Sequence, residues 1–159
     1  MQLREAEALM RRAIEAARRG IAAGQSPFGC AIQLGGEVVA SEHNRVRLAT
    51  DITAHAEVGA LRLACRRLGR IHLEGALVAS TTEPCPMCMA ALHWARVGAV
   101  VYGATIADAA EAGFNELRLP AAELLRAGGS PVRLAGGVLS EECRALFAEW
   151  QREPGSRPY

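Results

Sequence analysis

Pro84-Cys85-Pro86-Met87-Cys88 begins one predicted helix, and His55-Ala56-Glu57 begins an earlier one. Cys85 and Cys88 are three residues apart, so both thiols point to the same side of a helix. A helix N-terminus favours the thiolate form of a cysteine. Pro86 suits the first helical turn, because its missing N–H costs nothing there. The two stretches therefore predict two helix N-termini that face one metal ion.

The ligand set His55, Cys85 and Cys88 suits Zn²⁺, and three protein ligands leave a fourth coordination position open for water. Zinc lowers the pKa of a bound water toward neutrality. Glu57 stands two residues from a ligand. Its carboxylate can take a proton from that water and deliver it to a ring nitrogen and to a leaving amine. We expect one zinc ion per chain and hydrolytic chemistry at an amidine-like carbon.

Two other uses of these residues remain open. A redox pair would need the two cysteines but not the distant His-x-Glu. A closed structural zinc site, as in a zinc-stabilised binding module, needs a fourth protein ligand, which Cys65, Cys143 or His93 could supply. Cys30, Cys65 and Cys143 stand in apolar surroundings typical of inert core thiols. His72 and His93 are expected at the surface or in packing.

The composition is that of an ordinary globular protein, with 50% hydrophobic and 22% charged residues in a chain of 159. The net charge is +1, which does not favour a protein built to hold long nucleic acid. All 18 basic residues are arginine, so a catalytic lysine is excluded. No apolar run approaches the roughly 20 residues that span a bilayer, and the N-terminus lacks the layout of a signal peptide. We expect a single cytoplasmic domain.

The periodicity of apolar residues predicts helices that alternate with strands. We expect helices on both faces of one sheet, an α/β/α sandwich. Thr53 can cap the second helix, and Gly98 fits the stop position after the third. The predicted elements are a helix from Leu3 to Gly20 or Gly24, a hairpin over 31–40, a helix after Thr53, a strand over 75–80, a helix over 84–96, a strand over 99–102, a short helix over 121–126, a strand over 132–134 and a helix over 141–151.

With these residues in hand, the chain resembles the cytidine deaminase-like superfamily, of which His-x-Glu followed by Pro-Cys-x-x-Cys is typical. Within it the chain is most similar to the bacterial guanine deaminases, over most of its length from Pro27-Phe28-Gly29 to Tyr159. Residues 108–114 look like the purine-binding segment of that group, and Trp94-Ala95-Arg96 also looks like it. The resemblance implies a five-stranded mixed sheet between helices, one zinc ion and a homodimer.

The resemblance also implies roles for single residues. Glu57 would move protons, Asn44 would hydrogen-bond the purine, and Phe28 and His55 would flank the base. Further expected substrate contacts are Ala56, Trp94, Phe114, Asn115, Glu116 and Tyr159.

The segment after Phe114 departs from the guanine deaminases, which carry acidic residues there. This chain has Asn115-Glu116, so one charge is lost and the remaining carboxylate is one methylene longer. The change could admit another amino-heterocycle, such as cytosine, an aminotriazine or a nucleoside. Arg45 also differs and could lie near the pocket mouth. Alternatively, Asn115-Glu116 is a solvated turn and Asn44 bonds its own backbone.

Residues 153–159 contain two prolines and a glycine, which predicts an extended tail. A chain end is commonly frayed, but the resemblance implies that this tail closes an active site, with the partner subunit's as the expected one. The best single expectation is deamination of guanine to xanthine and ammonia. Another amino-heterocycle is the first alternative. Editing of tRNA adenosine is weaker, since no basic patch is evident.

Overall fold

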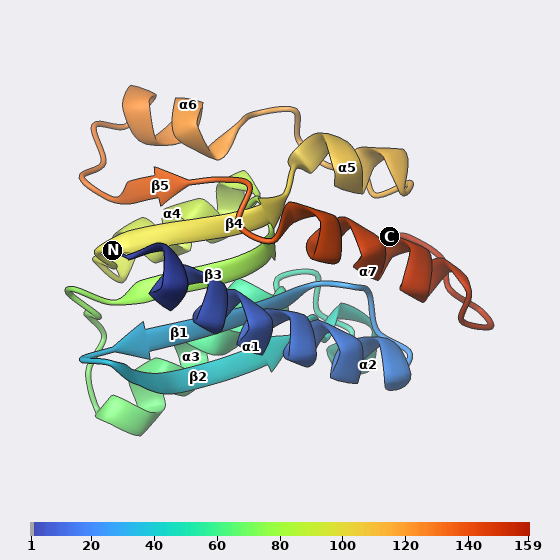
Figure 1. Ribbon diagram of the computed structural model, residues 1–159, viewed down its shortest axis with the longest axis horizontal. Helices are drawn as coiled ribbons and strands as arrows, with labels where there is room; N and C mark the ends of the chain where they lie inside the picture. Colours follow the sequence, from blue (N-terminus) through green and yellow to red (C-terminus); the bar gives the residue numbers. More distant parts are fainter. Residues whose placement is uncertain (1) are drawn as a thin grey trace.

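The computed structural model describes residues 2–159, in which helices cover both faces of one sheet (Figure 1). Within this range no helix has the length and apolarity that crossing a membrane requires. The elements are α1 (Leu3–Ala22), β1 (Gly29–Leu34), β2 (Glu37–His43), α2 (Val46–Ala49), α3 (Ala56–Leu68), β3 (Leu77–Thr82), α4 (Pro86–Trp94), β4 (Ala99–Ala104), α5 (Ile106–Glu111), α6 (Ala121–Ala127), β5 (Arg133–Ala135) and α7 (Ser140–Gln151).

The sheet has five strands in the order β2-β1-β3-β4-β5. β1 runs antiparallel to both β2 and β3, whereas β3, β4 and β5 are parallel. This confirms the expected five-stranded mixed sheet. The parallel pair β3 and β4 also determines where the site forms, because α4 must start where β3 ends in order to cross over to β4.

Successive residues of a strand point to opposite faces, and the central strands supply one core on each face. Ala79 and Val101 pack under α1 and α7, together with aromatic residues of the C-terminal half. Val78 and Val100 pack under α3, α4 and α6. α1 approaches β1 so closely that a Cβ on Gly29 would lie 2.1 Å from the Ala13 carbonyl oxygen. The expected α/β/α layering is confirmed.

Two local expectations were wrong, and two short helices were missed. His55, not Thr53, is the N-cap of α3, because Thr53 is bonded through its N–H and its hydroxyl to the Asp51 carboxyl. α4 ends at Trp94, where Arg96 turns the chain with a φ of 56°, so Gly98 is not its stop. The short helices α2 and α5 were not predicted, since six residues or fewer are too short to show a helical period.

Candidate active site

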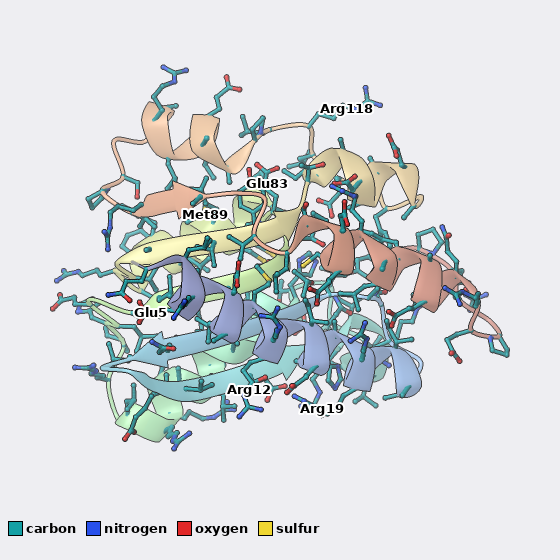
Figure 2. All side chains as sticks on the ribbon, viewed as in Figure 1. Glu5, Arg12, Arg19, Glu83, Met89 and Arg118 are labelled. Carbon is teal, nitrogen blue, oxygen red and sulfur yellow. The ribbon has the colours of Figure 1, made fainter. Side chains whose placement is uncertain are left out.

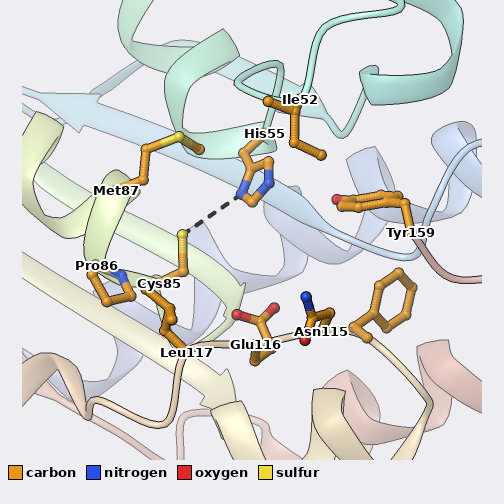
Figure 3. A pocket seen from close by; sticks show the side chains of 10 residues that line it. Ile52, His55, Cys85, Pro86, Met87, Asn115, Glu116, Leu117 and Tyr159 are labelled. Atoms are coloured by element: carbon orange, nitrogen blue, oxygen red, sulfur yellow. Dashed lines mark hydrogen bonds between the residues drawn. The ribbon is translucent and has the colours of Figure 1, made fainter.

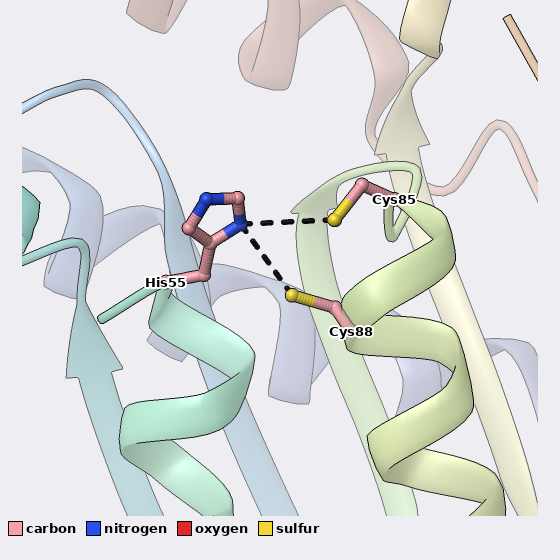
Figure 4. A group of neighbouring side chains, drawn as sticks. All are labelled: His55, Cys85 and Cys88. Carbon is pink, nitrogen blue, oxygen red and sulfur yellow. Dashed lines mark hydrogen bonds between the residues drawn. The ribbon is translucent and has the colours of Figure 1, made fainter. Parts of the chain in front are cut away.

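The side chains of His55, Cys85 and Cys88 converge at the starts of α3 and α4 (Figure 4). Nδ1 of His55 lies 3.8 Å from Sγ of Cys85 and 3.5 Å from Sγ of Cys88. Tetrahedral zinc with bonds of about 2.3 Å to sulfur and about 2.0 Å to nitrogen would place N and S about 3.5 Å apart. The cluster therefore has the donor set and the spacing of a zinc site, and the ligand atoms all lie within 4.8 Å of one another.

The local backbone explains why these donors meet. His55 and Cys85 are the N-cap residues of α3 and α4, both in extended conformation. Cys88 follows within the first turn of α4, and Pro86 occupies the start of that helix. A hydrogen bond with Cys88 lowers the pKa of the Cys85 thiol to about 4, although burial raises it, and a hydrogen bond with His55 adds to the lowering. Without metal the site thus favours the thiolate form of Cys85, whereas the hydrogen bond with Cys85 and burial raise the pKa of the Cys88 thiol.

Glu57 lies buried in the first turn of α3, beside this cluster. The Ser80 hydroxyl on β3 donates to Oε1 of Glu57 over 3.0 Å. Burial raises the pKa of the Glu57 carboxyl, against the opposing effect of nearby His55. A carboxyl whose pKa is raised both accepts and returns a proton more readily near neutral pH. Glu57 lines a small inner cavity with Phe28, His55, Thr82, Glu83, Cys85 and Glu116.

A larger pocket of about 280 Å³ opens outward from the cluster (Figure 3). The loop between α5 and α6 contributes Asn115 and Glu116, which lie across the cavity from His55 (Figure 3). Burial raises the pKa of the Glu116 carboxyl, and the negative charge of Cys85 raises it further. The lining residues are Ile52, His55, Cys85, Pro86, Met87, Phe114, Asn115, Glu116, Leu117 and Tyr159.

The C-terminal tail forms one wall of this pocket. The Tyr159 hydroxyl accepts a hydrogen bond of 2.6 Å from Nδ2 of Asn44, whose Oδ1 accepts one from the Val46 N–H. The Tyr159 ring packs edge-on against Phe114, with 5.6 Å between the ring centroids. Arg47 donates to the Arg157 carbonyl and so holds the approach of the tail. Tyr159 therefore lies in the pocket of its own chain.

The family follows from these residues and one comparison. The family model of the cytidine and deoxycytidylate deaminase zinc-binding region matches residues 3–104. The chain belongs to this deaminase family. It is a zinc-dependent deaminase with a single zinc site of His55, Cys85 and Cys88.

The similarity to known proteins extends over most of the chain. It is 45% identical to a guanine deaminase of Bacillus subtilis over 111 residues, 69% of this chain and 71% of that one. It is 34% identical to a tRNA-specific adenosine deaminase of Bacillus subtilis, over 92% of this chain and 89% of that one. The solved guanine deaminase of Nitrosomonas europaea is 29% identical, with a TM-score of 0.82 over 91% of this chain and 83% of that one. A solved structure in complex with 2,6-diaminopurine has a TM-score of 0.85 at 29% identity, over 95% and 84% of the two chains.

Three residues expected to contact substrate, Asn44, Ala56 and Trp94, do not line either cavity beside the zinc ligands. Trp94 is 79% exposed and does not line the pocket of its own chain, so its contact with substrate stays a prediction. It lies at the far end of α4 from Cys85, and nine residues at 1.5 Å per residue place it about 13 Å away along the axis. Ala56 is the first residue of α3, is fully buried and also lies outside the pocket lining.

The remaining candidates for metal or substrate are also accounted for. His93 lies at the surface, hydrogen-bonded to the Ser130 hydroxyl over 2.8 Å. Cys143 is buried against Gly103 on the other face of the sheet. Within residues 2–159 the metal-ligating group comprises only the three expected side chains. Arg45 lines a separate surface groove beside α2 and α3, not the zinc pocket.

Sequence reasoning missed several residues of the site. Ser80 and Glu83 carry polar groups into it, and Ile52, Met87 and Leu117 supply apolar lining. Met87 stands inside the zinc motif, so the motif itself could have indicated it. Nothing in the periodicity distinguishes Ser80 from any other polar residue at the end of a strand.

Metal analysis of the purified deaminase should find one zinc ion per chain. We expect Cys88→Ala to lose this zinc together with the activity, because a neutral methyl cannot replace a thiolate ligand. Cys30→Ala is the matched control, since that buried thiol lies outside the cluster. A zinc content far below one per chain, or a fourth protein ligand, would contradict a catalytic site with a position open for water.

Proposed function

We propose that residues 1–159 act as one deaminase domain that converts free guanine to xanthine and ammonia. The observation that carries this proposal is the Glu116 carboxyl, which lines the zinc pocket together with His55 and Tyr159. A half-buried carboxylate beside the reacting centre suits a ligand that offers two adjacent N–H donors. The N1–H and amino edge of guanine is such a ligand. The guanine deaminases among the similar proteins support the same substrate.

Different residues of the pocket would contact different parts of the base. Phe28 and His55 would flank the base, and Phe114 would support it from the aromatic cluster. Asn115 would contribute polar contact at the exposed rim. Both ends of the Asn44 amide are engaged in this structure, by the Tyr159 hydroxyl and the Val46 N–H. Asn44 would therefore hold Tyr159 in place. Alternatively, the purine would displace the bond between Asn44 and Tyr159 and bind Asn44 directly.

The proton path would run through Glu57. Zinc, when bound, supplies a water molecule activated for attack on the amino-bearing carbon. Glu57 would take the proton of this water and deliver it first to the ring nitrogen and then to the departing ammonia. The hydrogen bond from Ser80 holds the Glu57 carboxyl at the inner cavity, which this residue lines.

Editing of tRNA adenosine is the second candidate, favoured by the similarity to a tRNA-specific adenosine deaminase over 92% of the chain. Two observations support a free base instead. The pocket of about 280 Å³ is at the small end of ligand pockets, and Tyr159 narrows it. A net charge of +1 also gives little attraction for the RNA backbone.

The substrate is tested by the release of ammonia from a panel of compounds under identical conditions. The panel comprises guanine, cytosine, adenine, their nucleosides, an aminotriazine and a tRNA anticodon stem-loop that carries adenosine. We expect kcat/KM to be highest for guanine by at least tenfold. A higher value for another heterocycle, or for the stem-loop, would replace guanine as the substrate.

Removal of the tail should reduce activity without unfolding the protein. Deleting residues 157–159 removes Tyr159 from the pocket wall and opens it to water, which weakens the polar contacts inside. We expect kcat/KM for guanine to fall about 10- to 100-fold, the effect of losing buried hydrogen-bonded contacts. Zinc content and thermal unfolding should stay unchanged.

The matched variant Tyr159→Phe keeps the ring and removes only the bond with Asn44. It should lose less activity than the deletion. Undiminished kcat/KM in the truncated enzyme would show that the tail is an ordinary chain end.

We propose that the deaminase is a homodimer. α4 carries exposed apolar side chains on one stripe, of which Met87 is 37% and Trp94 is 79% exposed. Such a stripe is typical of a surface that is covered in the assembly. Light scattering should give twice the mass of 16.9 kDa, and Trp94→Ser should shift the protein toward the monomer. A wild-type mass of one chain at micromolar concentration would contradict the dimer.

A further inference from the structure

Glu83 is a buried acidic residue that the zinc chemistry does not use. It follows the end of β3 and precedes the ligand Cys85 by two positions. Its backbone N–H donates to the Ala104 carbonyl over 2.8 Å and so ties it to the end of β4. Figure 2 labels Glu83 close to the sheet, on the side toward α5 and α6. A buried carboxyl must find partners, because an unsatisfied one is costly.

Its partners are two backbone N–H groups far along the chain. Oε1 accepts from the N–H of Ala121 over 2.8 Å, and Oε2 accepts from the N–H of Ile106 over 3.3 Å. Ala121 is the first residue of α6, whose N-cap Pro120 has no side chain able to accept that bond. Ile106 is the first residue of α5. Both carboxyl oxygens are therefore engaged by backbone donors, although Glu83 borders the inner cavity.

The two donors bracket the segment that supplies substrate contacts. α5 begins at Ile106 and α6 at Ala121, and the loop between the two helices carries Phe114, Asn115 and Glu116. The Glu83 side chain thus connects the backbone next to the zinc ligand Cys85 with both ends of the segment that carries Glu116. Small displacements between such groups are expensive in catalysis, since misplacement by about 1 Å can cost about 10²-fold.

We propose that Glu83 is the positioning residue that sets the distance between the zinc site and the Glu116 carboxyl. Glu83 acts through the segment 106–121 and not through zinc, which His55, Cys85 and Cys88 hold from α3 and α4. The role of Glu116 itself rests on the proposed function.

The test is a double-mutant cycle between Glu83→Gln and Glu116→Ala in the zinc-loaded enzyme. Glu83→Gln keeps the shape of the side chain. Its amide NH₂ group, however, faces one of the two backbone N–H groups and cannot accept a hydrogen bond from it. We expect kcat/KM for guanine to fall about tenfold, mostly through KM, with unchanged zinc content. In the Glu116→Ala background the same change should cost less than twofold, because coupled residues are not additive. Glu123→Gln, an exposed carboxyl on α6, is the matched control and should have no effect.

Hydrogen exchange at the Ile106 and Ala121 amides gives a second readout that is independent of activity. Both amides should exchange faster in Glu83→Gln than in wild type or Glu123→Gln. Glu83→Asp, which is one methylene shorter, should recover part of the protection. If Glu116→Ala leaves activity intact, the substrate role of Glu116 fails. Hydrogen exchange at the Ile106 and Ala121 amides is then the only test of the role of Glu83. Additive losses in the cycle, loss of zinc in Glu83→Gln, or unchanged exchange would overturn the positioning role.

Discussion

Glu57→Gln should retain one zinc ion per chain and lose nearly all turnover of guanine. The amide of glutamine cannot accept the proton of the attacking water, and general acid–base groups contribute about 10²- to 10⁴-fold. We expect a loss toward the upper end, because one carboxyl would serve several proton transfers. The measurements are kcat by ammonia release and zinc by metal analysis on the same sample.

The structure indicates that Glu57→Gln changes the proton chemistry without disturbing the packing of the site. Glutamine can still accept the bond from the Ser80 hydroxyl through its own side-chain oxygen, so the buried site keeps its packing. Glu37→Gln on β2, an exposed carboxyl, is the matched control and should behave as wild type. Turnover of Glu57→Gln within a few-fold of wild type would assign the proton transfers to another group.

Glu116→Ala should reduce kcat/KM for guanine by at least about 10²-fold. The substitution leaves two N–H donors of the bound base without acceptors in the pocket, and such unpaired groups typically cost about 1–3 kcal/mol each. Sites that hydrogen-bond their substrate discriminate strongly for this reason. The loss should be smaller for a heterocycle that lacks the amino group beside a ring N–H.

Two further variants define what the loss means. Glu116→Gln keeps one acceptor oxygen and should fall between wild type and alanine. Glu111→Ala removes an exposed carboxyl from α5 and should leave kcat/KM unchanged. If Glu116→Ala matched wild type on the best substrate, the segment after Phe114 would be only a turn.

The zinc site could be predicted from the sequence because its ligands lie at two helix starts. The spacing of Cys85 and Cys88 puts both thiols on one side of a helix, whatever surrounds them. The sheet could be predicted for a similar reason, since the apolar runs at 77–79 and 99–101 are fully buried central strands. Such local patterns survive folding because a single element determines them.

The remaining contacts depend on distant partners. Asn44 and Tyr159 are 115 positions apart, and the bond between them exists only because the tail returns past α2. Glu83 reaches 23 and 38 residues along the chain to its two donors. His55 displaces Thr53 as the cap of α3 because Asp51 takes the threonine. The periodicity of the sequence does not indicate these long-range contacts. The resemblance to relatives also did not reveal that Trp94 lies at the opposite end of α4 from Cys85.

A crystal structure of zinc-loaded Glu57→Gln with guanine bound tests the proposed deaminase site most directly. We predict zinc on His55, Cys85 and Cys88 with no fourth protein ligand, and the amino-bearing carbon of guanine facing the metal. Both oxygens of Glu116 should accept N–H groups of the base, with the Tyr159 ring still forming the wall. A fourth protein ligand on the zinc, or guanine bound with Glu116 turned toward solvent, would contradict this site.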